Sequence, residues 1–103
     1  MSTNIVYDFD WDATKATSNV AKHGVTFDQA ATVFADALAL TVFDAAHSQP
    51  EERWFTLGHD QTGMMLAVAH TYQTTGPRSA HVRIISARAA TKRERRFYED
   101  EPQ

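Results

Sequence analysis

Basic side chains gather in one segment near the end of this 103-residue chain. Residues 78–96 hold seven lysines and arginines against a single acid, Glu94, whereas the rest of the chain holds three against twelve acids. The seven are Arg78, Arg83, Arg88, Lys92, Arg93, Arg95 and Arg96. Because the net charge of the chain is -3, this segment predicts a local anion-binding surface rather than a general affinity for nucleic acid. The alternative is a solvated face whose cations pair with acids elsewhere.

Histidines are the next candidates for acid–base chemistry. The chain has five: His23, His47, His59, His70 and His81. None has the i, i+4 or H-x-H spacing of a metal site. His47 lies in a polar loop six residues before Arg53, and His70 ends a predicted strand, so either could act as a base. His23 is better explained as part of a helix end beside Gly24, and most isolated histidines are surface or hydrogen-bonded core groups.

Several enzyme classes are excluded because their residues are missing. The chain has no cysteine, and it has no glycine-rich phosphate loop, serine elbow or catalytic carboxylate pair. The acids Asp8, Asp10 and Asp12 lack the glycine and glutamate of a calcium loop. We therefore expect neither a metal nor a cofactor. Metal-free RNA cleavage remains possible, because it needs only a base for the 2′-OH, cations for the phosphate and an acid for the leaving oxygen.

The length and the 43% hydrophobic content predict one globular domain over residues 1–103. Apolar and acidic residues alternate over Tyr7–Trp11, which predicts a short, half-buried strand. Asp12 is placed to cap a helix over Ala13–Lys22, and Gly24 suits the left-handed position that ends it.

A second helix follows directly. Thr26 and Gln29 have the spacing of a capping box, and apolar residues continue at helical spacing to about Asp36. With only three residues between them, the two helices are expected to form a helical hairpin.

The second half of the chain predicts a small antiparallel sheet and a last helix. The expected strands are Leu38–Asp44, Arg53–His59, Met64–Tyr72 and His81–Arg88. Turns are expected at residues 60–63 and 75–77, and the short connections favour antiparallel neighbours. The last helix is expected from Thr91 to about Glu99, with Glu94 completing a second capping box. The fold class is therefore α+β.

The charges of this last helix are reversed with respect to its dipole. Lys92 and Arg93 occupy the positive end, and Glu99 and Asp100 the negative end. A local rule that is broken without a local gain is typical of functional sites, so the start of this helix is a candidate binding surface.

Alternation along the last strand does not say which of its faces is buried. One face carries His81, Arg83, Ile85 and Ala87, and the other carries Val82, Ile84, Ser86 and Arg88. Arg83 either pairs with an acid such as Glu52 or joins other arginines around a phosphate.

Five segments together resemble the family of BrnT-type toxins. They are residues 9–12 (FDWD), 19–27 (NVAKHGVTF), 31–36 (ATVFAD), 47–53 (HSQPEER) with Gly58, and 83–98 (RIISARAATKRERRFY). They cover nearly the whole chain, in order and at family-like spacing, and the last is the most distinctive.

The resemblance implies a RelE-like fold, in which an N-terminal strand and a helical hairpin pack on a small antiparallel sheet with a C-terminal helix. It also implies a toxin of a type II toxin–antitoxin system: a metal-independent ribonuclease that inhibits translation. Its partner would be a BrnA-like ribbon-helix-helix antitoxin, with operator DNA bound only through that partner. No signal peptide or membrane segment is evident, so a cytoplasmic location is expected.

Site residues follow from the resemblance by position. The implied catalytic residues are His47, Glu52, Arg53, Arg83 and Arg88. The implied RNA-binding residues are Lys92, Arg93, Arg96, Tyr98 and His70. Arg83 and Arg88 would hold the scissile phosphate, His47 or Glu52 would be the base, and the cations of the last helix would steer the RNA backbone.

A different class of function stays open. The chain could bind its antitoxin as a catalytically inactive co-repressor, with the helices as partner surfaces. The two arginines of the last strand discriminate between these hypotheses, because cleavage needs them accessible and convergent, whereas a binder tolerates them in salt bridges.

Overall fold

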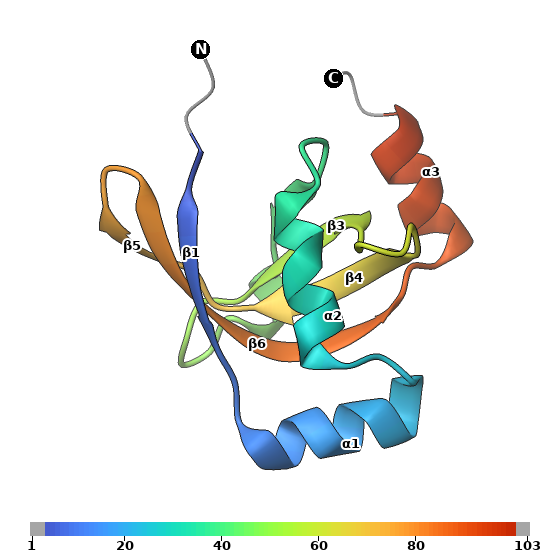
Figure 1. Cartoon of the computed structure of the whole chain (residues 1–103), viewed down its shortest axis with the longest axis horizontal. Coiled ribbons are helices and arrows are strands. Elements are labelled where there is room, and N and C mark those ends of the chain that lie inside the picture. Colours follow the sequence, from blue (N-terminus) through green and yellow to red (C-terminus); the bar gives the residue numbers. More distant parts are fainter. Residues whose placement is uncertain (1–3, 101–103) are drawn as a thin grey trace.

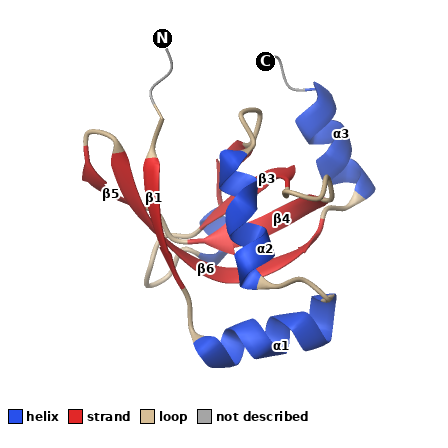
Figure 2. Ribbon diagram, viewed as in Figure 1, coloured by secondary structure: helices blue, strands red, loops and turns tan. Residues whose placement is uncertain are grey.

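The computed structural model describes residues 4–100. Three α-helices and six strands form a mixed α+β fold (Figures 1 and 2). The helices are α1 (Ala13–His23), α2 (Phe27–Ala31) and α3 (Lys92–Asp100); short 3-10 turns lie at Thr32–Ala35 (η1) and Ala45–His47 (η2). The strands are β1 (Val6–Asp10), β2 (Leu40–Phe43), β3 (Trp54–His59), β4 (Met65–His70), β5 (Gln73–Gly76) and β6 (Ser79–Ala89). Each predicted strand and helix is present with boundaries that differ by one or two residues, except that the second helix, expected to about Asp36, is α-helical only to Ala31 and continues as the 3-10 turn η1.

The sheet departs from the prediction in two ways. Its strand order is β1-β6-β4-β3-β2, and β1 pairs with β6 in parallel, so the sheet is not wholly antiparallel as expected. The additional strand β5 pairs with the first part of β6, in a segment that was expected to be only a turn. This segment is too short, and too poor in apolar residues, for its two threonines to predict a strand, and pairing with β6 supplies the order.

The capping predictions are confirmed. Asp12 accepts a hydrogen bond from the backbone N–H of Lys15 at 2.9 Å, and Gly24 has φ +71°. Thr26 and Gln29 make both bonds of the capping box. Yet α1 and α2 do not lie side by side as a hairpin; they run in different directions, and each packs on β6 (Figure 1).

Asn19 of α1 replaces a strand at the edge of β6. Its amide nitrogen donates to the Ala87 carbonyl at 2.8 Å, and its amide oxygen accepts from the Ala87 N–H at 3.1 Å. The same nitrogen donates to the carbonyl of Val25 at 2.9 Å. The pairing of β1 with β6 ends at Asp10, and beyond it this buried side chain takes up the hydrogen bonds on the same side of β6. It thereby fixes α1 against the sheet.

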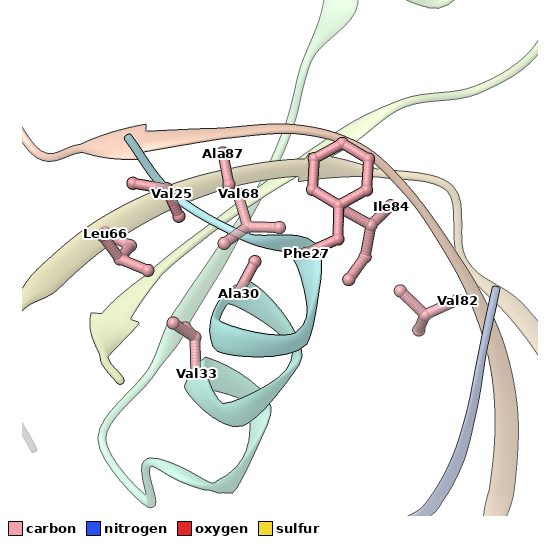
Figure 3. Close-up of a cluster of buried hydrophobic side chains, with 9 residues drawn as sticks. All are labelled: Val25, Phe27, Ala30, Val33, Leu66, Val68, Val82, Ile84 and Ala87. Carbon is pink, nitrogen blue, oxygen red and sulfur yellow. The ribbon is translucent and has the colours of Figure 1, made fainter. Parts of the chain in front are cut away.

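The main core lies between α2 and one face of the sheet. Side chains of α2 and η1 point toward β4 and β6 (Figure 3). The cluster comprises Val25, Phe27, Ala30, Val33, Leu66, Val68, Val82, Ile84 and Ala87. Phe27 is 2% exposed, and its truncation to alanine typically costs about 3–5 kcal/mol.

A smaller cluster lies on the opposite face, which we call the open face. Tyr98 of α3 packs there with Leu57, Met65 and Ala67. It is the buried residue of α3, so this helix covers one end of the open face. No helix within residues 4–100 is long and apolar enough to cross a membrane.

Candidate functional site

A bulge in β6 brings Arg83 and Arg88 to the same face of the sheet. Ala69 pairs with Ser86 and His70 with Ile84, so Ile85 has no partner in β4. The extra residue reverses the alternation, and Ala87 consequently joins Val82 and Ile84 in the main core. The face assignment from strict alternation, which separated the two arginines, is therefore wrong.

Both arginines lie on the open face, about four residue rises or roughly 13 Å apart along the strand. Register also brings Arg53 onto this face. Arg53 precedes the Trp54–His70 pair and Thr71 follows it, while the Thr71 N–H donates to the Arg83 carbonyl at 3.0 Å. Extending the register by one residue beyond β3 and β4 therefore aligns Arg53, Thr71 and Arg83, with the two arginines about 10 Å apart at their backbones.

Arg53 has an unsatisfied donor. Its Nε is buried and has no hydrogen-bond partner among the described residues. A buried N–H without a partner costs free energy, which a rearrangement that brings the guanidinium to an anion would recover.

Arg83 is accessible. Its side chain is 49% exposed, and its nearest carboxylate oxygen is Asp10 Oδ2, 3.7 Å from Nη1. The expected acidic partner, exemplified by Glu52, is therefore replaced by Asp10, because the parallel pairing of β1 places Asp10 opposite Arg83. At this distance the ion pair is weak and leaves the guanidinium open to a ligand.

The terminal nitrogens of Arg88 both have close hydrogen-bond partners. Its two terminal nitrogens donate to the two carboxylate oxygens of Glu94 at 2.7 and 2.9 Å. Glu94 also accepts from the Thr91 N–H at 2.9 Å, so the pair joins β6 to the first turn of α3. The fork from Arg88 lowers the pKa of Glu94 to about 2.

The two candidate bases lie in the loop that leads to Arg53. His47 is 67% exposed at its side chain, and its Nδ1 is 3.0 Å from Asp44 Oδ2. Glu52 is exposed. Ser48 ties this loop together, since its hydroxyl accepts from the Arg53 N–H at 3.0 Å and donates to the Asp44 carbonyl at 2.6 Å. Both candidates consequently lie in the loop that directly precedes Arg53.

On α3, Lys92, Arg93 and Arg96 are exposed as expected of an RNA-steering surface. Tyr98 is not. It is 6% exposed, and its hydroxyl donates to Asp36 Oδ2 at 2.7 Å. Burial, together with this bond, raises the pKa of Tyr98 to about 12. Its side chain fixes α3 to the sheet and does not present a surface to RNA.

Asp36 anchors this contact. It also accepts from the backbone N–H groups of His59 at 2.8 Å and Leu38 at 3.0 Å. Burial opposes its ionisation, but these bonds and the Tyr98 hydroxyl outweigh burial and lower its pKa. Gly58 is needed beside it, since a Cβ there would lie 3.0 Å from Asp36 Oδ2.

His70 is likewise removed from the surface. It is fully buried, its Nδ1–H donates to the Thr71 carbonyl, and its Nε2 accepts from the Thr56 hydroxyl, both at 2.7 Å. Burial lowers its pKa, so the ring is a neutral core group. His70 lies at the end of its strand, but apolar residues flank this strand on both sides. They explain why the histidine is buried.

Comparison with known proteins identifies the family. The family model described as "Ribonuclease toxin, BrnT, of type II toxin-antitoxin system" matches residues 11–94. The chain belongs to this family. The match covers most of the chain, and it includes the elements that carry Arg53, Arg83 and Arg88.

A solved structure supports the fold of this BrnT family member. The ribonuclease toxin BrnT of Brucella abortus, a crystal structure at 1.1 Å resolution, aligns with a TM-score of 0.52 at 20% identity. The alignment covers 88% of this chain and 100% of the Brucella chain. A comparison with curated proteins gave no match. Membership of the family makes the chain a ribonuclease toxin, and it implies an antitoxin partner.

One polar cluster on the open face escaped the sequence analysis. His81 lies between the carboxylates of Asp8 and Asp10, both from β1. Strand alternation already put His81 and Arg83 on one face, but the carboxylates could not be placed there without the parallel pairing of β1 with β6. Within residues 4–100, no three histidine, aspartate or glutamate side chains are grouped in a way that could hold a metal ion.

Proposed function

We propose that this BrnT family member is a metal-independent endoribonuclease whose active site is the Arg53–Arg83 end of the open face. One observation carries the proposal: the register aligns Arg53, just before β3, with Arg83, and Arg53 has an unsatisfied Nε while Arg83 is half exposed. Two such guanidiniums can hold a phosphate in forked geometry and stabilise the additional charge of a pentacoordinate phosphorus.

The remaining chemistry is proton transfer. His47 or Glu52, in the loop before Arg53, removes the proton of the 2′-OH, which then attacks the neighbouring phosphorus. Exposed Lys92, Arg93 and Arg96 attract the RNA backbone toward the face. Arg88 can contact a phosphate only by giving up Glu94, so it contributes to the site chiefly through the placement of α3.

In the cell we infer that cleavage occurs in the cytoplasm and inhibits translation, and that a BrnA-like ribbon-helix-helix antitoxin neutralises it. Operator DNA would be bound through that antitoxin. We also propose that the fold is RelE-like, because helices cover one face of the sheet and only part of the other.

The test is incubation of the purified chain with single-stranded RNA and with translating ribosomes, each with and without EDTA, beside R83A. We expect cleavage that EDTA does not stop and that R83A loses. Cleavage that EDTA abolishes and a divalent cation restores would contradict metal independence. Intact RNA in both settings, from folded protein, would contradict ribonuclease activity itself.

The co-repressor alternative has one observation in its favour. The closed Arg88–Glu94 fork is a partly exposed salt bridge of the kind that a pure binding module tolerates. Induced expression separates the two functions: growth arrest that is relieved by co-expressed antitoxin supports the toxin, whereas unimpaired growth with intact antitoxin binding supports the co-repressor.

A further inference from the structure

His81 is held on the open face by two carboxylates. Its Nδ1–H donates to Asp8 Oδ2 at 2.9 Å, and its Nε2 is 3.4 Å from Asp10 Oδ1. The side chain is 30% exposed, so the ring is fixed on one side and open to solvent on another. An imidazole with a carboxylate at each nitrogen is favoured in its doubly protonated form.

The ring lies next to Arg83. The two residues are separated by one residue of β6, both belong to the open face, and Asp10 stands opposite Arg83 in the neighbouring strand. Asp10 also contacts both, through Oδ1 to His81 and Oδ2 to Arg83. The longer of the two histidine contacts, the ion pair at Nε2, is therefore the one made to the carboxylate that Arg83 also contacts.

We propose that His81 is the general acid of RNA cleavage, with Nε2–H directed at the leaving oxygen of the phosphate that Arg83 binds and with Asp8 as the positioning residue. The inference rests on the proposed ribonuclease function and names the proton donor that the sequence analysis left without a residue.

The step balances without a metal or a redox partner. The base removes the 2′-OH proton, the 2′ oxygen forms a bond to phosphorus, and the bond from phosphorus to the 5′ oxygen breaks. His81 Nε2–H donates its proton to that 5′ oxygen. The products are a 2′,3′-cyclic phosphate and a 5′-hydroxyl, and His81 is left neutral with Nδ1–H still bonded to Asp8.

The surrounding charges favour this role. Asp8 and Asp10 face the ring from β1, Arg83 is the nearest cation on β6, and β5 contributes the neutral Gln73 opposite. The hydrogen bond to Asp8 and the charges of both carboxylates raise the pKa of His81. The ring thus stays protonated to a higher pH than an isolated histidine, and donation to the leaving oxygen requires that form.

The test uses the full chain and two matched oligonucleotides: one ordinary RNA, and one in which sulfur replaces the 5′ oxygen at the cleavage site. A thiolate leaves without protonation, because the pKa of a thiol, about 8.5, lies far below that of an alcohol. We expect H81Q to cleave the ordinary RNA about 100-fold more slowly than the wild type, but the sulfur substrate at nearly the wild-type rate. R83A should lose activity on both substrates. H59Q, which alters another exposed histidine beside an aspartate, is the matched control and should retain activity on both.

A second variant covers the case in which H81Q does not fold. D8N keeps the ring and removes its positioning carboxylate, so the high-pH decline of the cleavage rate should move to lower pH. An unmoved pH profile in folded D8N, an equal loss on both substrates, or unchanged cleavage of the ordinary RNA by H81Q would overturn the assignment while leaving the ribonuclease proposal intact. Absence of cleavage by the wild-type chain, on free RNA and on translating ribosomes, would overturn both.

Discussion

Arg83 and Arg88 lie on the same strand and the same face of the sheet, but they have different surroundings. Arg83 lies 3.7 Å from Asp10 and is half exposed, whereas Arg88 is forked to Glu94 at 2.7 and 2.9 Å and is less exposed. A guanidinium that already has a close bidentate partner has little to offer a phosphate, whereas a loosely paired one does. The comparison therefore supports the proposed ligand-binding role for Arg83 and a structural role for Arg88, although sequence alone treats the two alike.

The largest expected effect is on catalysis. R83A should lower RNA cleavage by about 100-fold or more, because it removes one donor to the charge that develops on the phosphate. R88A should lower it much less. R78A, an exposed arginine in the turn before β6, is the matched control and should cleave at the wild-type rate. A larger loss in folded R88A than in R83A would reverse the roles given to the two residues.

Stability should show the opposite order. R88A leaves the partly buried Glu94 carboxylate without its main partner, and we expect its free energy of unfolding to fall by about 1–2 kcal/mol. R83A should leave the unfolding free energy nearly unchanged, because the ion pair with Asp10 is long and exposed. Urea denaturation of both variants measures the difference, and the double variant R88A/E94A shows whether the loss belongs to the pair.

Acid should weaken the α3 end specifically. The pKa of Glu94 is lowered from 4.5 to about 2 in the folded chain, so its contribution to stability is complete above pH 4.5 and is lost as the pH falls toward 2. Allowing for its partial exposure, the contribution is on the order of 1–2 kcal/mol. In E94Q this part of the acid destabilisation should be absent. Identical pH dependence of unfolding in E94Q and the wild type would contradict a close fork in solution.

The smallest effects are expected from the exposed cations of α3. Replacing Lys92, Arg93 and Arg96 together by alanine should weaken binding of a non-cleavable oligonucleotide and reduce its dependence on salt. The slope of log affinity against log salt is negative. For each phosphate that the variant no longer neutralises, it should become less negative by about 0.7 for single strands. An unchanged slope would exclude these residues from the RNA path.

Local features were predictable because they depend on neighbours in sequence. Asp12, Gly24, the Thr26–Gln29 box and the Thr91–Glu94 box all have their expected bonds or conformation. Each requires only the right residue at a fixed spacing from a helix end.

The site depended on long-range pairing, and there the sequence was insufficient. The bulge at Ile85 is a shift in the register between β4 and β6. The alternation of residues along one strand cannot reveal a shift relative to another strand. The acidic partner of Arg83 lies on β1, which pairs with β6 in parallel. No short turn connects these two strands, so their pairing could not be predicted from a turn. His70 and Tyr98 are of residue types that often act in functional sites, but both side chains are buried in the core.

The most direct test of the roles of these arginines is to follow their side chains while RNA binds. In an NMR titration with a 2′-O-methyl oligonucleotide, which cannot be cleaved, the Nε–H signals of Arg53 and Arg83 should shift with the bound fraction. The signal of Arg88 should stay in place, because its fork to Glu94 persists in the complex. A shift at Arg88 with Arg53 and Arg83 unmoved would contradict these roles, since it would place the phosphate at the α3 end of the open face.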